Sequence, residues 1–208
     1  SWDIHFQYYF ANLIIENGYW NHNISQGVNS LISIVLLAPM YSLLLNLELV
    51  WVYKIIYPFF FSFVPLGIYY IAKNQFGDAK LALFASFTFM FYYGFFKDMV
   101  DKQFIAELFL ILSFIAMTDD DIKAKKGFLI IFLLMLPLSH YGVSYLFLIA
   151  LLFATLFMRL YNIHEISIKV VEFFTVSVFS WYVYTSSGKV FNNIVDTGYM
   201  AIKNLNNI

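Results

Sequence analysis

The chain has no cysteine, few charged residues and no recognisable nucleotide-binding motif. The absence of cysteine excludes a disulfide framework, a thiolate metal site and a cysteine nucleophile. Only 12% of the 208 residues are charged, against roughly 25% in a soluble domain. The net charge of −1 provides no basic surface for nucleic acid. No P-loop, GxSxG, HExxH or glycine-rich dinucleotide motif occurs, so nothing supports a cytoplasmic nucleotide-driven enzyme.

Apolar residues dominate the chain instead. Hydrophobic residues make up 62% of it and aromatic residues 22%, which is too much apolar surface for a water-soluble fold. Runs close to the roughly 20 residues that a spanning helix needs cover 49–72, 81–96, 103–118 and about 168–186. We therefore predict an all-α, polytopic transmembrane helix bundle in the plasma membrane. We expect one domain, with 1–48 as an outer juxtamembrane segment, 49–186 as the membrane spans and 187–208 as the start of an outer loop. Because the chain starts at Ser1 rather than at methionine, we expect it to be a piece of a longer protein.

The charge-free stretch 127–158 is too long for one straight helix. Such a helix would measure about 48 Å, whereas the hydrocarbon core is ~30 Å thick. The sequence Pro137-Leu138-Ser139-His140-Tyr141-Gly142 predicts the break. The two halves, 127–136 and 143–158, are each too short to cross fully. We therefore expect their junction to lie within the outer half of the bilayer.

Basic residues indicate the orientation, because they favour cytoplasmic loops. Seven of the twelve lie in the predicted inner loops 73–80, 119–126 and 159–169. The loop at 97–102 and the break at His140 then face the outside. Segment 31–47 is ambiguous, since it fits either a kinked span or a helix lying at the interface.

The opening segment predicts an amphipathic helix on the membrane surface. Its polar stripe is His5, Tyr9, Asn12 and Glu16. Its apolar side is Phe6, Phe10, Leu13 and Ile14. Asp3 and Gln7 lie one turn apart, which brings a carboxylate and an amide together near the start of this helix. If 31–47 lies at the interface, Asp3 is also extracytoplasmic.

Acidic residues on the predicted outer side are candidates for chemistry. Asp3 with His5 suits a carboxylate base or a metal ligand, but equally a helix N-cap beside a histidine at headgroup level. Asp98 and Asp101 are spaced to share one metal ion or one acceptor hydroxyl. The alternative is an ordinary acidic loop that Lys97 and Lys102 neutralise.

Two further candidates lie within or beside the predicted spans. Glu107, with Gln103 one turn earlier, places a carboxyl group inside a span, where charge costs roughly 2.5–3.5 kcal/mol at the centre of the bilayer. It either has a function or reaches water and pairs near the helix end. His140, with Tyr141, is suited to donate hydrogen bonds to a phosphate. The alternative is a buried histidine bonded to a carbonyl that the break has freed.

The order of these features resembles the GT-C superfamily, whose members are polytopic glycosyltransferases that use lipid-phosphate-linked sugars. The resemblance rests on Trp2-Asp3-Ile4-His5 opening an amphipathic helix, Leu37-Ala38-Pro39-Met40 beside the membrane, the span exit Tyr69-Tyr70-Ile71-Ala72-Lys73, the acidic loop Asp98 to Asp101, and the broken helix pair with His140 at its tip. The sequence looks closest to an uncharacterised archaeal membrane-protein family near that superfamily.

The resemblance implies a GT-C-like fold and a function. Asp3 would be the catalytic base of an inverting sugar transfer from a polyprenyl-phosphate donor to an extracytoplasmic acceptor. Asp98, Asp101 and His5 would bind the acceptor or a metal, and His140 and Tyr141 would contact the lipid phosphate. Any cofactor would be a divalent cation, Mg²⁺ or Mn²⁺, near Asp3 and Asp98.

Two other functions stay open at this point. A polytopic transporter or lipid flippase would use the broken helices and would place Glu107 in its path. A catalytically silent scaffold subunit would tolerate replacement of both Asp3 and His140.

Overall fold

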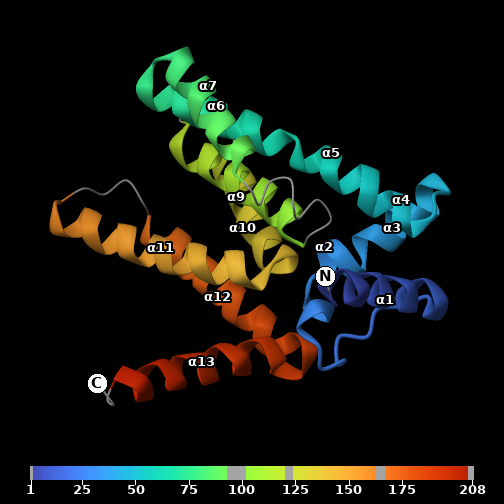
Figure 1. The fold of residues 1–208 in the computed structure, drawn as a ribbon. Coiled ribbons are helices and arrows are strands. Elements are labelled where there is room, and N and C mark those ends of the chain that lie inside the picture. The colour runs from blue at the N-terminus through green and yellow to red at the C-terminus, as the bar shows by residue number, and fades with distance from the viewer. Residues whose placement is uncertain (1, 93–101, 120–123, 163–166, 206–208) are drawn as a thin grey trace.

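All regular secondary structure in the part of the chain that the structure describes is helical, as predicted (Figure 1). The structure is a computed structural model that describes residues 2–92, 102–119, 124–162 and 167–205, with the side chains of all of these except 2, 3, 201 and 205. The prediction of an all-α protein is therefore confirmed over these ranges.

The N-terminal part consists of one longer helix and several short ones. Their bounds are α1 Trp2–Asn17, the 3-10 turn η1 Gly27–Ser30, α2 Ile32–Val35 and α3 Leu37–Leu45. Together α2 and α3 form an apolar stretch over 32–45. Its length of about 21 Å is shorter than a hydrocarbon core of ~30 Å. The ambiguous segment 31–47 thus has the length of an interfacial segment rather than that of a span.

A continuous helical run of 28 residues follows, Leu49–Phe76, which is long and apolar enough to cross a membrane. It is built from α4 Leu49–Trp51, the π-helical stretch η2 Val52–Ile56, α5 Tyr57–Phe61 and α6 Phe63–Phe76. The run ends at Gly77, whose φ of 69° is a left-handed conformation that glycine adopts without strain. Asp78 then caps α7, Ala79–Phe91, by accepting the Lys80 N–H at 2.7 Å. The predicted exit from the span is therefore a tight turn between antiparallel helices.

The later helices confirm the predicted break and correct the lengths of its two halves. Their bounds are α9 Gln103–Thr118, α10 Lys125–Ser139, α11 Tyr141–Leu160 and α12 Ile168–Tyr184. The helices α10 and α11 meet at His140, which is extended (φ −158°, ψ 120°). With 20 residues, α11 is the second helix long and apolar enough to cross a membrane. The prediction that neither half could cross is wrong for α11, because this helix starts directly after His140 and continues through Arg159 to Leu160.

The connections between helices lie at two opposite ends of the bundle. In Figure 1 the α6–α7 turn and the C-terminal end of α11 lie on the left, away from α1, α2 and the α10–α11 junction. Beyond α12, the short turn η3 Thr185–Gly188 leads into α13, Lys189–Leu205. Residues 187–208, expected to begin an outer loop, are thus mainly helical in their described part.

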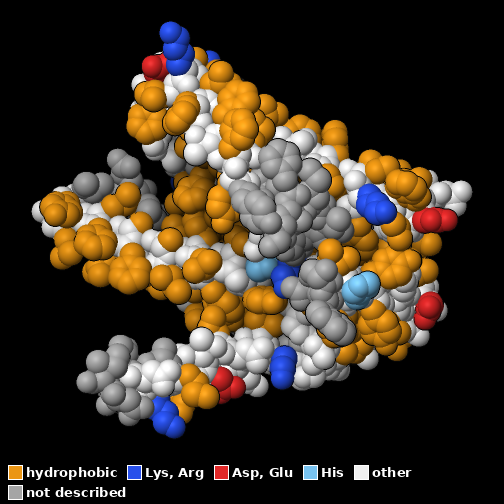
Figure 2. Space-filling model, viewed as in Figure 1, with side chains coloured by type: hydrophobic (Ala, Val, Ile, Leu, Met, Phe, Trp, Pro, Cys, Tyr) orange, Lys and Arg blue, Asp and Glu red, His pale blue; other side chains and the backbone are white. Residues whose placement is uncertain are grey.

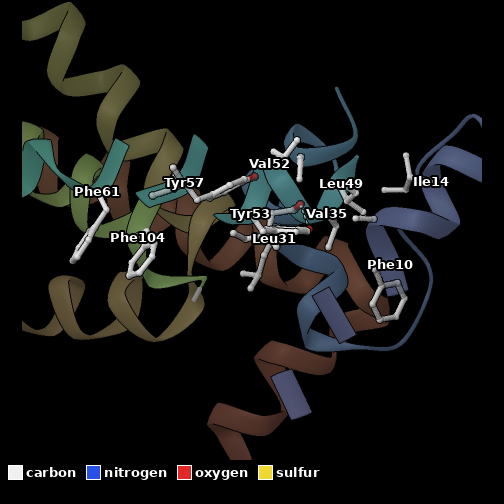
Figure 3. Packing of buried hydrophobic residues seen from close by; sticks show 14 of the residues in the cluster. Phe10, Ile14, Leu31, Val35, Leu49, Val52, Tyr53, Tyr57, Phe61 and Phe104 are labelled. Carbon is white, nitrogen blue, oxygen red and sulfur yellow. Dashed lines mark hydrogen bonds between the residues drawn. The ribbon is translucent and has the colours of Figure 1, made fainter. Parts of the chain in front are cut away.

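Two clusters of buried apolar side chains hold the fold together. The first joins α1–α5 to the start of α9, and Figure 3 shows it extending from Phe10 and Ile14 to the stacked pair Phe61 and Phe104, whose ring centroids are 4.2 Å apart. The second joins α10, α11 and α12, with Phe174 and Tyr182 fully buried. Outside these clusters, apolar side chains cover much of the face in Figure 2, where charged groups lie scattered.

The helix α1 has one buried face, but this face differs from the predicted apolar side. His5, Tyr9 and Glu16 are exposed, as expected. Phe6, placed on the apolar side, is 43% exposed, whereas Gln7 is only 1% exposed. The difference arises because α1 packs on protein, with Phe10 in the first cluster, so neighbouring helices rather than lipid determine which residues are buried.

Close packing of α6 against α9 yields a stability prediction. A Cβ atom at Gly67 would lie 2.6 Å from Ile111 Cγ1, so we expect Gly67→Leu to lower the free energy of unfolding by about 1–3 kcal/mol through overpacking. Gly127 of α10 has no described atom within 4 Å of such a Cβ, and Gly127→Leu is the matched control. Unfolding in mixed detergent measures both variants. Partial rescue of Gly67→Leu by Ile111→Ala is expected, and equal stability of the two leucine variants would contradict the prediction.

Candidate functional site

The predicted acidic residues lie largely outside the described structure. Asp98 and Asp101 belong to residues 93–101, which the structure does not describe, and the same holds for the side chain of Asp3. The backbone of Asp3 is placed in the first turn of α1, four residues before Gln7. The helix α2 contacts both α1 and α10. The helix α1, which carries the predicted base, and the helix α10, which ends at the break, therefore both pack against α2.

His140 occupies the junction between α10 and α11, where it caps the second helix. Its Nδ1 accepts a hydrogen bond from the Val143 N–H at 3.1 Å, and its ring stacks on Tyr141 with centroids 5.1 Å apart. The side chain is only 5% exposed. Because Nδ1 accepts, the neutral imidazole carries its proton on Nε2, which makes Nε2 a hydrogen-bond donor.

The alternative for His140 was a buried histidine bonded to a carbonyl that the break has freed. The histidine is buried, but another residue bonds to the Pro137 carbonyl at the break. Proline 137 lies in the last turn of α10, and its carbonyl accepts the Tyr182 hydroxyl at 2.8 Å. A side chain of α12 thus satisfies the Pro137 carbonyl, whereas the His140 side chain caps α11. Gly142 permits this arrangement, since a Cβ there would lie 3.0 Å from His140 Cε1.

Lys102 is the residue that the sequence reasoning assigned only to charge neutralisation. It is 7% exposed, and its Nζ donates to the Tyr141 hydroxyl over 3.3 Å while lying 5.3 Å from the centre of that ring. Its burial against Tyr141 is a tertiary contact that the sequence alone does not reveal.

Lys102, Tyr141 and His140 form one cluster of hydrogen-bond donors, which we call the donor cluster. Lys102 also occupies the N-cap position of α9, so the positive end of that helix adds to its charge. An ammonium group, a phenol and an imidazole N–H together suit a bound phosphate. The cluster joins residues 39 positions apart in the chain.

The remaining candidates are more dispersed. Gln103 and Glu107 are half-buried in the first turns of α9, and His5 is exposed on α1. Within the described ranges, no group of three or more His, Asp or Glu side chains is arranged to hold a metal ion. Because Asp98, Asp101 and the side chain of Asp3 lie outside those ranges, the metal prediction stays a prediction.

Buried Gln7 yields a prediction about stability. Its Nε2 has no hydrogen-bond partner among the described residues, and an unsatisfied buried donor costs about 1–3 kcal/mol. We expect Gln7→Leu to raise the free energy of unfolding by about 1 kcal/mol, because leucine is similar in size and needs no partner. Gln75→Leu, at an exposed position of α6, should change stability little. A lower stability of Gln7→Leu would show that the amide makes a favourable interaction.

Comparison with known proteins agrees with the apolar helices. No curated protein and no solved structure matches the chain. Residues 125–208 match the model of a family described as "Predicted membrane protein (DUF2206)". The matched region runs from α10 to α13 and includes His140 and Tyr141. Over these residues the chain is similar to predicted membrane proteins, and α11, one of its two long apolar helices, lies in the matched region.

Proposed function

We propose that the protein is a membrane glycosyltransferase that moves a sugar from a polyprenyl-phosphate-linked donor to an acceptor at the extracytoplasmic face. The observation that carries the proposal is the donor cluster, in which nearly buried Lys102 meets Tyr141 beside His140. A phosphate attached to a lipid would approach from the membrane, so no nucleotide-binding motif is needed. The order of sequence features shared with the GT-C superfamily adds the sugar and the direction of transfer.

The chemistry divides between the base and the donor cluster. Asp3 accepts the proton of the acceptor hydroxyl while the oxygen of that hydroxyl bonds to the anomeric carbon of the sugar. The bond between that carbon and the phosphate oxygen breaks, and the configuration inverts because attack and departure occur on opposite faces. The leaving polyprenyl phosphate gains negative charge, which the Lys102 ammonium, the Tyr141 hydroxyl and the His140 Nε2–H stabilise.

A divalent cation fits the residues that the resemblance assigns to it by their chemistry. Asp3, Asp98 and Asp101 offer the carboxylate oxygens that Mg²⁺ and Mn²⁺ prefer, and His5 lies exposed on the same helix as Asp3. Bound there, the ion would orient the acceptor hydroxyl and lower its pKa. Proton acceptance itself remains with Asp3.

A transfer assay tests the proposal. The protein is reconstituted in vesicles with a polyprenyl phosphate that carries a radiolabelled hexose, and a panel of alcohol and glycan acceptors is supplied. We expect the label to appear on an acceptor with one equivalent of free polyprenyl phosphate. Label that stays on the lipid while the lipid crosses the bilayer would identify a flippase and overturn the proposal.

A further inference from the structure

A groove lies between α10 and α12. It encloses about 360 Å³. Its lining comes from one face of each helix: Leu134, Pro137 and Leu138 of α10, and Ser177, Ser180, Trp181 and Tyr184 of α12. Trp181 also packs against the second buried cluster, which contains Phe174 and Val178 of the same helix. The groove therefore borders this cluster, and none of its lining residues belongs to the donor cluster.

The lining of the groove has few polar groups that need a hydrogen-bond partner. The Ser177 hydroxyl already donates to the Phe173 carbonyl at 2.8 Å, which leaves carbon as the main surface. Along α10 the same face continues one turn further with Ile130 and Ile131, which are 47% and 49% exposed. The apolar strip thus runs along the helix axes toward the opposite end of the bundle.

The outer end of the groove is held rigid by the N-terminal segment. Trp181 stacks on Trp20 with ring centroids 6.0 Å apart, and its Nε1 donates to the Ser30 carbonyl at 3.0 Å. Tyr184 stacks on His22 at 4.8 Å. Two of the lining aromatic side chains are therefore fixed by residues more than 150 positions away in the chain. These contacts set the positions of Trp181 and Tyr184 at this end of the groove.

We infer that this groove binds one hydrocarbon chain of a bilayer lipid, aligned with α10 and α12. The occupant follows from the surroundings: both helices lie in the region that matches a family of predicted membrane proteins, so lipid is the apolar partner at hand for the groove. Tryptophan and tyrosine gather at the level of lipid headgroups, and Trp181 and Tyr184 mark that level at one end of the groove. The inference does not depend on the proposed sugar transfer.

Photolabelling tests the inference. The protein is reconstituted in phosphatidylcholine–phosphatidylglycerol vesicles with a trace of phospholipid carrying a diazirine in its acyl chain. We expect peptides that contain 134–138 and 177–184 to be labelled about tenfold more than the exposed apolar face of α11, where Leu146 is 70% exposed. Equal labelling of all lipid-facing helices would overturn the inference, because it would indicate only the general lipid annulus.

Variants provide the matched comparison. Ser180→Trp fills the groove and should reduce its labelling about tenfold, whereas Val183→Trp, at a 54% exposed position outside the lining, should not. Leu134→Trp blocks the groove from α10 and keeps the test valid if Ser180→Trp unfolds. Unchanged labelling in both groove variants would overturn the inference. So would a dimer that dissociates on Ser180→Trp, since a second copy would then occupy the groove.

Discussion

Replacement of Asp3 by asparagine is expected to lower the turnover of sugar transfer by roughly 10²- to 10⁴-fold, the usual contribution of a general base. Asparagine has nearly the same shape as aspartate but cannot accept the proton of the acceptor hydroxyl. Binding of the donor should remain, because the lipid phosphate is assigned to Lys102, Tyr141 and His140. The measurement is initial transfer rate against donor concentration in reconstituted vesicles.

Two other carboxylate-to-amide changes serve as controls for this result. Glu16→Gln alters an exposed position of the same helix and should leave transfer unchanged. Glu107→Gln alters the half-buried carboxyl of α9 and should affect transfer mildly. If Glu107→Gln is the damaging change and Asp3→Asn the mild one, the protein is better described as a transporter or flippase. If Asp3 and His140 can both be replaced without loss, it is a scaffold subunit.

Replacement of Lys102 by glutamine is expected to raise the KM for the lipid-linked donor by roughly ten- to a hundredfold. A hydrogen bond to a charged group contributes about 1.5–3 kcal/mol, and each 1.4 kcal/mol corresponds to a factor of ten. Lys102 is nearly buried, so solvent screens its charge less than that of a surface lysine. Turnover should fall as well, because the same charge stabilises the leaving phosphate.

The control variants separate charge from structure. Lys189→Gln removes an exposed charge at the start of α13 and should leave the KM unchanged. Tyr141→Phe removes the hydrogen bond from Lys102 but keeps the ring, and should cost less than Lys102→Gln. Lys102→Arg keeps the charge and should retain part of the donor affinity. An unchanged KM in Lys102→Gln would remove the lysine from the proposed site.

The helix break shows how much of the structure can be predicted from local sequence. Pro137 lacks the N–H that would bond to Leu133 within α10, and Gly142 leaves space for the His140 ring, so the break lies within this short segment of neighbouring residues. The length of α11 was not predicted correctly. It depends on the His140 Nδ1 bond to Val143, which lets the helix start at Tyr141. A side-chain cap of this kind is uncommon enough that a hydropathy pattern does not reveal it.

The incorrect prediction of the buried face of α1 has a different physical cause. Periodicity placed Phe6 with the apolar residues and left Gln7 unassigned, because the most apolar stripe of a helix normally faces inward. In the structure Gln7 faces inward and Phe6 outward, since α1 packs on neighbouring helices rather than lying free at the interface. In a membrane protein an exposed phenylalanine is not penalised as it is in water, so hydropathy is a weak guide to the inward face.

The sequence by itself predicted an apolar, all-helical chain, the approximate extent of α9 and α12, and the place where the charge-free stretch breaks. These features depend on the apolar content, on charges at helix ends, and on proline and glycine, which act over a few residues. Only the tertiary structure brought Lys102 to Tyr141, Trp20 to Trp181, and α10 beside α12 to form a groove. Spacing along a chain determines which residues share a helix face, whereas contacts between helices depend on how their whole surfaces pack.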